Sequence, residues 1–243
     1  ALTDINNTSA CLNFVRKATE YDIRPILGID FRNGVEPCFV GIAKNNEGFL
    51  ELNNFLSDHI HYEKKIPDIA PKFEHVFVIY PFEKVLQHEK KIFDEHEFIG
   101  VSVNELKRLR FSKLLEQRDK IVLLQPVTFR NKRDFNAHRL LRAIDNNTLL
   151  SMLSVTEQAR EDEHMYAIPN LAAHFSEHSF ILENTQQLMD ACSIHFDFTT
   201  GRKPQNLSTY LGSTKEDEVF LEQLCQEGLP KRYPEIDQAV LDR

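Results

Sequence analysis

The chain has 243 residues, with 29 Lys and Arg against 37 Asp and Glu, a formal charge of -8 and a hydrophobic content of 42%. At roughly 100 to 200 residues per domain, this length fits one large or two small domains with a hydrophobic core, and the composition excludes a disordered or fibrous protein. The apolar runs are far shorter than the roughly 20 residues of a membrane span, and no signal peptide pattern begins the chain, so we expect a soluble protein.

The charge balance and the cysteines restrict the partners and the compartment. An acidic chain is a poor candidate for coating nucleic acid by itself, because phosphate binding needs clustered Lys and Arg, but a domain of a larger DNA enzyme is not excluded. The cysteines are scattered and form no CxxC pair, which indicates neither a disulfide framework nor a zinc site: Cys11, Cys38, Cys192 and Cys225. We therefore expect a reducing, cytoplasmic location.

The first half of the chain alternates short strands and helices. The opening ALTD (Ala1 to Asp4) resembles the end of a buried strand, so we expect an upstream piece to be missing. A helix follows, with Asn6, Asn7 and Thr8 as candidate caps. The next predicted elements are strands at 23–30 and 38–43 joined at Asn33-Gly34, a helix at 47–59, a strand at 75–80, a helix at 82–93 and a strand at 97–103.

The alternation continues into the second half and then changes. A helix at 106–117, a buried strand at 120–129 and a helix at 135–144 complete a pattern that predicts an α/β domain with a largely parallel sheet or barrel. Residues 148–211 are predicted to be mostly helical, with a strong helix at 179–192 and one short strand at 195–198. A polar linker at 199–213 precedes a last amphipathic helix at 215–227.

Two carboxylates, Asp4 and Asp30, follow predicted strands at the positions where α/β folds place catalytic groups. Together they can share a divalent cation, since such ions prefer oxygen ligands, but two ligands alone make a weak site. A helix cap or a loop hydrogen bond is the favoured explanation of Asp4 taken alone.

Three further patterns have simpler explanations. His59-Ile60-His61 has the HxH spacing of metal ligands on a strand, but its helical context separates the two imidazoles and favours a surface pair. The cluster from Glu161 to His164 is typical of a solvated loop. Two basic groups, interrupted by acids, favour a solvated face over a nucleic-acid groove: Lys107, Arg108, Arg110 and Lys113, then Arg130, Lys132 and Arg133. The motifs of phosphate loops, zinc proteases and serine hydrolases are absent from the sequence.

Five segments in collinear order carry a resemblance to a known family. They are ALTDINNTSACLNFVRKATEYDIRPILGIDFRNG (1–34), GIAKNNEGFLELNNFLS (41–57), RNKRDFNAHRLLRAIDNNTLL (130–150), the region 175–198, and QLCQEGLPKRYPE (223–235). Along nearly the whole chain these segments resemble the N-terminal PHP (polymerase and histidinol phosphatase) domain of the bacterial replicative DNA polymerase III alpha subunit. The resemblance implies a distorted (β/α)7 barrel whose first strand, with an HxH metal motif, lies upstream of Ala1, and palm carboxylates downstream of Arg243.

The resemblance also allows the family's metal site to be checked position by position. Asp4 matches the aspartate of the family's TDH loop, but Ile5 stands in place of its histidine, and Asp30 replaces a glutamate. Pro126 and Thr128 stand where the family has an Asp-x-His pair. Proline has no donor atom in its side chain, and a neutral hydroxyl is a poor substitute for imidazole. We therefore expect vestigial positions that hold no metal, with no catalytic residue and no cofactor in this chain.

These inferences lead to a degenerate PHP domain at 1-200, followed at 201-243 by a linker and the first helix toward the palm. The expected role is structural and partner-docking within DNA replication, with no polymerase activity of its own. The resemblance implies as partners the rest of the alpha subunit, a proofreading exonuclease subunit and DNA bound through the parent polymerase. That parent is a DNA-directed DNA polymerase (nucleotidyltransferase) that uses Mg. No membrane is expected as a partner.

The alternative from another class is an active metal-dependent phosphoesterase or 3'-5' exonuclease that uses Mn or Zn. It would need other residues to restore the ligand set, and His75, His96 and His138 are the candidates; His59 and His61 could contribute only if their segment is not helical. A free-standing PHP phosphatase is disfavoured, because the GLPKRYPE segment leads into more protein in the family.

Overall fold

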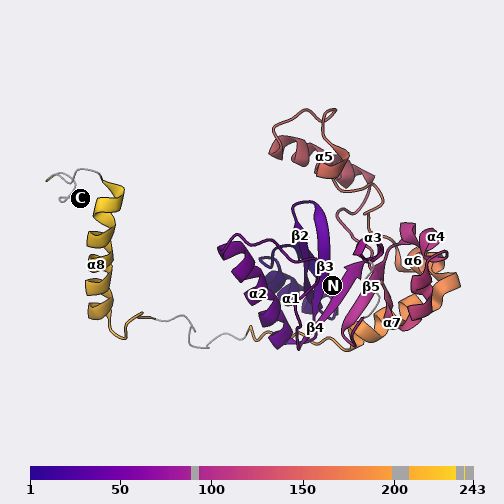
Figure 1. Cartoon of the computed structure of the whole chain (residues 1–243), viewed down its shortest axis with the longest axis horizontal. Helices are drawn as coiled ribbons and strands as arrows, with labels where there is room; N and C mark the ends of the chain where they lie inside the picture. Colours follow the sequence, from indigo (N-terminus) through magenta and orange to yellow (C-terminus); the bar gives the residue numbers. More distant parts are fainter. Residues whose placement is uncertain (89–92, 199–207, 234–237, 239–243) are drawn as a thin grey trace. The chain divides into compact units, whose positions relative to one another are not determined.

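A computed structural model describes residues 1–88, 93–198, 208–233 and 238 of the chain (Figure 1). The chain divides into two compact units, Ala1–Asp197 and Phe198–Arg243. No helix in the described ranges is long and apolar enough to cross a membrane.

One sheet organises the first unit. Its six strands are β1 (Leu2–Ile5), β2 (Leu27–Asn33), β3 (Glu36–Ala43), β4 (Val76–Pro81), β5 (Glu97–Val101) and β6 (Ile121–Leu123), and they lie in the order β1-β2-β3-β4-β5-β6. The β2–β3 and β3–β4 pairs are antiparallel, whereas β1–β2, β4–β5 and β5–β6 are parallel. The predicted hairpin is confirmed: Gly34, with φ of +63°, makes the turn between β2 and β3, a conformation that glycine adopts without strain.

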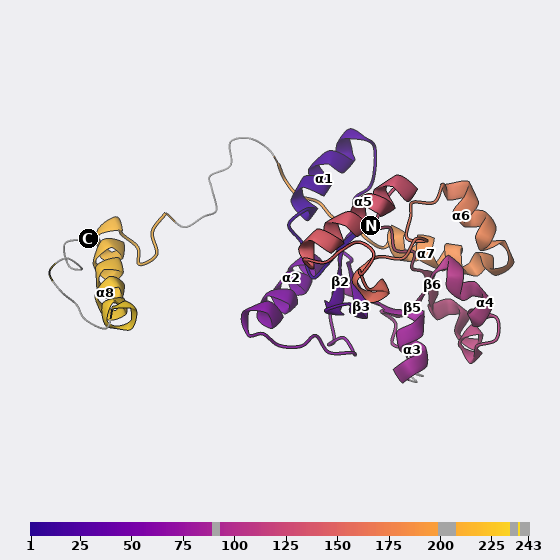
Figure 2. The same ribbon diagram turned by 90° about the horizontal axis from the view of Figure 1, so that it is seen from above.

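Most helices of the first unit flank this sheet. In chain order the described helices of this unit are α1 (Cys11–Glu20), α2 (Asn46–His61), α3 (Phe82–His88), α4 (Leu106–Leu109), α5 (Lys132–Asp145), α6 (Ile168–His174) and α7 (Ser179–Asp190), with short 3-10 helices η1 (Val103–Glu105), η2 (Lys113–Lys120), η3 (Val155–Glu157) and η4 (Ser176–His178). Figures 1 and 2 show α1 and α2 beside the β1–β3 end of the sheet and α4, α6 and α7 beside the β5–β6 end. The second unit contains α8 (Thr214–Arg232).

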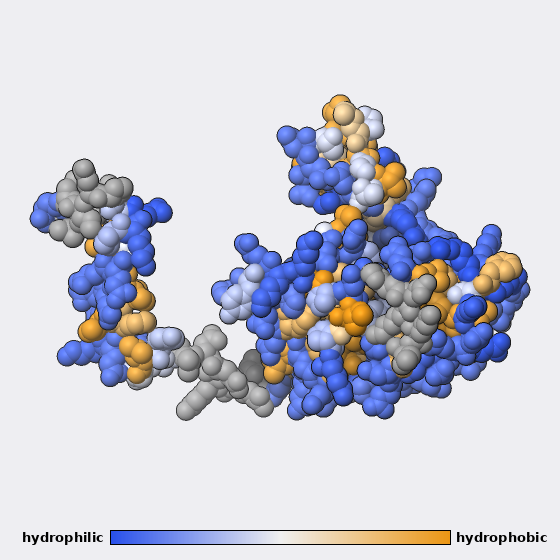
Figure 3. Space-filling view, in the orientation of Figure 1, coloured by the Kyte–Doolittle hydropathy of each residue, from blue (hydrophilic) through white to orange (hydrophobic). Residues whose placement is uncertain are grey.

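The two faces of the sheet have different neighbours. Along β4, Val76, Val78 and Tyr80 belong to the large core beneath the helices, and the intervening Phe77 and Ile79 belong to a smaller core on the opposite face. This alternation follows from the two-residue period of a strand. Residues of α7, including Leu188, and Cys192 just after it complete the smaller core. Elsewhere, α5 and the segment after it expose apolar side chains (Figure 3): Leu140, Leu141, Ile144, Leu149, Met152 and Val155.

The α/β class is confirmed, but the sheet of the described residues is mixed and open rather than largely parallel. The buried strand predicted at 120–129 ends at Leu123, because α7 side chains take up the backbone groups of β6. The Thr185 hydroxyl accepts from Leu123 N at 2.8 Å, and Asn184 Nδ2 donates to Ile121 O at 2.8 Å. Pro126, which has no N–H to donate, follows three residues later.

Several smaller predictions are also wrong. The strand predicted at 195–198 does not form, because the Asn46 side chain pairs with the backbone N–H and carbonyl of His195 at 3.1 and 2.6 Å. The helix predicted at 106–117 breaks into α4 and η2, since Ser112 caps a new helix by accepting from Leu114 N. Of the helix predicted at 82–93, residues 89–92 lie outside the described residues, as do residues 199–207 of the predicted linker.

Gly28 tests the close packing of β1, β2 and β3. A Cβ atom at this position would lie 2.3 Å from Gly41 O and 2.9 Å from Ile42 Cδ1, so Gly28→Ala forces backbone to move. We expect a loss of about 1–3 kcal/mol of unfolding free energy, measured by urea denaturation. Gly228→Ala, whose new Cβ would meet nothing within 4 Å inside α8, is the matched control and leaves that unfolding transition unchanged. Equal stability of the two variants would contradict the packing described here.

Candidate functional site

A cavity of about 390 Å³ lies on the face of the sheet that carries the smaller core, around the carboxyl ends of the parallel strands. Strand residues of β1 to β5 and the segment that follows β6 line it, with two residues of a later loop: among them are Thr3, Asp4, Asp30, Arg32, Pro37, Val40, Pro81, Gly100, Ser102, Glu105, Gln125, Pro126, Arg160 and Glu163. Ligand sites of α/β proteins lie at such strand ends.

The predicted metal positions meet only in part. Asp4, Asp30 and Pro126 line the cavity, but the register pairs Asp30 with Ile5 and Asp4 with Ile29, so the side chains of Asp4 and Asp30 extend from opposite faces of the sheet. Ile5 itself is 52% exposed and does not line the cavity. The Thr128 hydroxyl donates to Glu163 Oε2 at 2.6 Å, so the residue at the family's histidine position holds a loop instead.

The Asp30 carboxylate is paired with an arginine of the same strand. Arg32 donates from Nε at 3.0 Å and from Nη2 at 2.6 Å, both to Asp30 Oδ2, and the side chains are 26% and 14% exposed. The second oxygen, Asp30 Oδ1, is buried and has no hydrogen-bond partner in the described structure. One side of the carboxylate therefore has a fixed counter-charge, while the other side is desolvated without a donor.

Asn6 fixes the backbone from which Arg32 extends. Its side chain donates to Arg32 O at 2.8 Å and accepts from Arg32 N at 3.0 Å, so the amide pairs with β2 as a further strand residue would. The register of β2 against β3 shifts between Phe31 and Arg32, beside this clamp. The predicted capping role is wrong for Asn6, Asn7 and Thr8: the N-cap of α1 is Ala10, without a side-chain hydrogen bond, and Thr8 donates to Asn53 Oδ1.

Further charges surround the pair. Burial lowers the pKa of Arg32, but its hydrogen bonds to Asp30 and the negative charges of Asp30 and Glu163 outweigh this effect and raise the pKa above its usual value. Arg160 donates to Asp162 at 3.0 and 2.7 Å. Burial raises the pKa of Asp162, but these bonds and the charge of Arg160 prevail, so the carboxyl has a lowered pKa. The cavity thus holds permanent cations next to its carboxylates.

This arrangement does not fit the metal cluster that the resemblance implies. Within the described residues, no group of three or more His, Cys, Asp or Glu side chains could hold a metal ion. The guanidinium of Arg32 takes one oxygen of Asp30 and repels a second cation, and Pro126 supplies no donor atom. Chemically, the site can orient carboxylates and guanidinium groups, but it lacks the donor set for several divalent ions.

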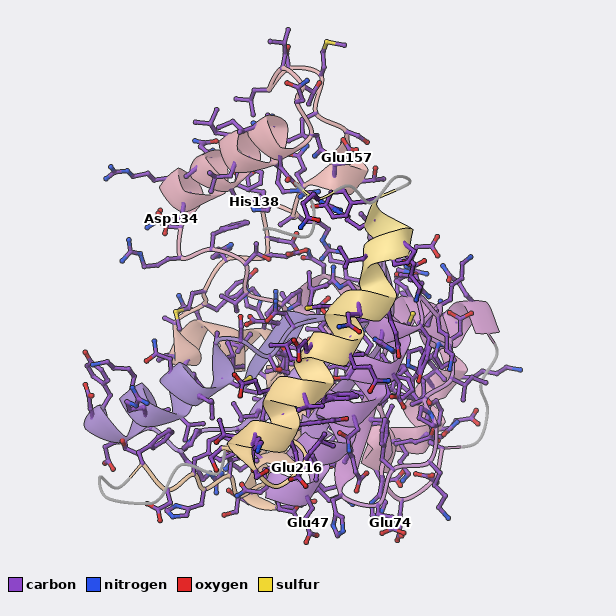
Figure 4. All side chains as sticks on the ribbon, turned by 90° about the vertical axis from the view of Figure 1, so that its left-hand side faces the viewer. Glu47, Glu74, Asp134, His138, Glu157 and Glu216 are labelled. Carbon is purple, nitrogen blue, oxygen red and sulfur yellow. The ribbon has the colours of Figure 1, made fainter. Side chains whose placement is uncertain are left out.

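The alternative ligands lie elsewhere, and none of them lines the cavity. His75 Nε2 is 3.1 Å from Glu47 Oε2, and the His96 ring lies against Phe77. His138 accepts from Ala159 N at 2.9 Å. Figure 4 shows His138 on α5 and Glu47, the partner of His75, at opposite ends of the view.

The HxH pair lies in the last turn of α2, so the helical interpretation of this segment is confirmed. His59 Nδ1 is 2.8 Å from Phe55 O and its ring packs on Phe55, whereas the His61 ring packs on Tyr62. The two imidazoles therefore have separate neighbours.

Sequence reasoning missed three residues of the cavity: Arg32, Arg160 and Glu163. The cluster from Glu161 to His164 was expected to be a solvated loop, yet Glu163 lines the cavity and its carbonyl accepts from Thr128 N at 2.8 Å. Only Arg32 had a usable signal, because residues two apart on a strand share a face and Arg32 follows Asp30 at that spacing. Arg160 bonds to Asp162, two residues away, but that spacing does not place either residue near the strands, and the contact of Glu163 with Thr128 spans 35 residues of sequence.

The fold and the cavity define an α/β domain with a carboxylate–guanidinium site at the ends of its strands. No family model matches the chain. It is similar to the DNA polymerase III subunit alpha of Ureaplasma parvum, at 24% identity over 243 residues that cover 98% of this chain and 22% of the relative. It is also similar to the subunit of that name from Halalkalibacterium halodurans (22% identity over 265 residues, 97% of this chain and 23% of the relative) and from Chlamydia pneumoniae (21% over 318 residues, 96% and 25%).

The resemblance to the DNA polymerase III alpha subunit is thereby confirmed along nearly the whole chain. The chain spans about a quarter of the length of the curated relatives it matches.

Arg32→Ala should destabilise the chain by about 1–3 kcal/mol, because it leaves the Asp30 carboxylate buried without a donor. Asp30→Asn added to this variant should recover part of the loss, since a neutral amide needs no counter-ion. Urea denaturation of the single and double variants measures both effects. The control is Arg24→Ala, which removes an exposed pair with Asp190 and should cost much less. Equal losses in Arg32→Ala and Arg24→Ala would show that the Asp30–Arg32 pair contributes no more to the unfolding free energy than an exposed pair does.

Proposed function

We propose that this chain is the PHP-domain region of a DNA polymerase III alpha subunit and serves in DNA replication as a structural and partner-docking domain. In this proposal it does not polymerise DNA and holds no catalytic metal. Its partners are the rest of the alpha subunit, a proofreading exonuclease subunit and, through the parent polymerase, DNA; Mg belongs to that polymerase. The location is cytoplasmic. The similarity to three alpha subunits along nearly the whole chain supports this assignment.

The single observation that carries the metal-free role is the Asp30–Arg32 pair. A guanidinium 2.6 Å from Asp30 Oδ2 supplies the positive charge that a metal ion would supply at this position. Because the charge of Arg32 is covalently attached and its pKa is raised, it stays in place at any physiological pH. In this proposal the carboxylates contribute to the structure of the domain and take no part in catalysis.

A PHP domain implies a barrel, and the lining of the cavity supports this part of the proposal. Residues of β1, at one edge of the sheet, and residues 124–127, which follow the other edge strand, line the same cavity. The two edges of the sheet therefore turn toward each other. A strand added to the free edge of β1, where the resemblance puts the family's first strand, would bring the sheet closer to a closed barrel.

A specific observation also favours the alternative, an active phosphoesterase or 3'-5' exonuclease. Asp4 and Asp30 both line the cavity, and Asp30 Oδ1 is buried without a hydrogen-bond donor. Buried oxygens of this kind are the ligands that Mn²⁺ and Mg²⁺ prefer. The two functions differ in metal content, which can be measured directly.

The test is the metal content of the purified chain after incubation with Mn and Zn and removal of free ions, measured by plasma mass spectrometry. We expect well under one bound ion per chain, no fall of the melting temperature with EDTA, and no release of nucleotides from single-stranded DNA. A ligand that binds only the folded state raises its stability by mass action, so a bound metal would make the melting temperature sensitive to EDTA.

The control is Asp4→Asn combined with Asp30→Asn, which removes both remaining carboxylate ligands. Two or three ions per wild-type chain that this variant loses, together with nuclease activity, would overturn the metal-free role and establish the alternative. Ions that the variant retains would not depend on Asp4 or Asp30 and would contradict the alternative as stated here.

A further inference from the structure

A basic corner of the first unit displays one aromatic ring to solvent. We define this corner by α4, η2, η4 and the start of α7, which pack on one another. Phe111 lies in the turn between α4 and η2 and is 88% exposed. Among the described residues it makes no ring contact and no cation–π contact. Large aromatic side chains contribute most to binding when a partner covers them.

The turn that carries Phe111 is held firmly. Leu109, two residues earlier, is fully buried in the main core. Phe111 N donates to Arg108 O at 3.1 Å, and Ser112 N donates to Leu109 O at 2.9 Å. Ser112 then caps η2. An ordered turn presents the ring at a low entropic cost of binding, since little further ordering is needed.

Four basic residues flank the ring in sequence, at positions 107, 108, 110 and 113, while the acids Glu116 and Asp119 lie farther along η2. Lys107 and Lys113 are exposed and form no ion pair within the described residues. Arg108 and Arg110 contact Glu83 and Glu177, but their side chains are 57% and 56% exposed, and such pairs contribute little and exchange readily for other anions. A cation–aromatic pair belongs to the same corner, since the Arg118 guanidinium lies 5.5 Å from the centroid of Phe180. The other basic group of the sequence, around Arg130 to Arg133, lies at the start of α5 and does not contribute to this corner.

We propose that the basic corner binds single-stranded nucleic acid, with a base stacked on Phe111 and phosphates near Lys107 and Lys113. Stacking needs an unpaired base whose face is free, which a duplex does not offer, and every base has such a face, so the contact is tolerant of sequence. The cations complement the phosphate charge. Because the whole chain has a formal charge of -8, we expect phosphates to be attracted at this corner rather than over the whole surface. The choice of DNA over RNA rests on the proposed function, whereas the proposal that this surface binds a single strand does not.

The experiment measures fluorescence anisotropy of labelled oligo(dT) of about 20 nucleotides with the full chain at low salt. Phe111→Ala should weaken binding about tenfold and Phe111→Tyr should retain it, because the tyrosine ring stacks equally well. Lys107→Gln combined with Lys113→Gln should weaken binding and lower the slope of log K against log salt by about 1.4, at about 0.7 per phosphate contact. The matched control is Tyr21→Ala, which removes a ring that is 71% exposed between Glu20 and Asp22, and should bind as the wild type does.

Binding of oligo(dT) that Phe111→Ala leaves unchanged, equal binding of a duplex, or no binding at low salt would each overturn the proposal. Phe111 is exposed, so its variants should melt as the wild type does, and circular dichroism checks that they fold. Oligo(U) bound by the corner in place of oligo(dT) would contradict the choice of DNA. The metal content of the chain tests the proposed function independently, because no cavity residue changes in these variants.

Discussion

A carboxylate buried at the end of a strand needs a counter-charge, and most features of the cavity follow from how Asp30 obtains one. Arg32 supplies it from the same strand, two residues along, with both of its hydrogen bonds to one oxygen. Holding the guanidinium there requires a fixed backbone at Arg32, and the Asn6 side chain provides this with two hydrogen bonds. The first loop of the chain is thus tied to β2, and the edge of the sheet is ordered through a polar contact rather than through apolar packing.

At the opposite edge of the sheet, the backbone groups of β6 need hydrogen-bond partners. The backbone of β6 would expose unpaired groups, yet Thr185 and Asn184 of α7 accept from and donate to them. A helix therefore takes the place that a further strand would occupy, and the segment after β6 is released to turn over the cavity. Side chains of α7 therefore cover the β6 edge, whereas Asn6 extends the pairing of β1 with β2, and the sheet does not close within the described residues.

Hydrophobic periodicity predicted the elements whose side chains pack on the sheet. The helices at α1, α2 and α7 and the hairpin at Asn33-Gly34 form where their patterns place them, because an apolar face or a turn residue decides each one locally. The predicted helix at α5 also forms, although its apolar side chains stay exposed. The strand at 195–198 failed because a distant side chain, Asn46, took its backbone groups. Asn6 failed as a cap for the same reason, since its partner is 26 residues away.

The candidate site was predictable to a similar extent. The resemblance placed Asp4, Asp30 and Pro126 at one location, and the cavity contains all three. It could not reveal that Arg32 turns toward Asp30, because a register shift between Phe31 and Arg32 and a clamp from another loop set that geometry. Glu163 and Arg160 reach the cavity through a loop whose course depends on contacts with Thr128 and Asp162.

The Asp30–Arg32 pair also has an evolutionary consequence. A chain that gained metal ligands one at a time would have to lose Arg32, and that intermediate would carry an uncompensated buried charge. Gaining a histidine at Thr128 first would break its contact with Glu163 while Arg32 still occupied Asp30. Each single step lowers the stability of the fold before a metal ion could bind, so single substitutions toward a metal site are disfavoured.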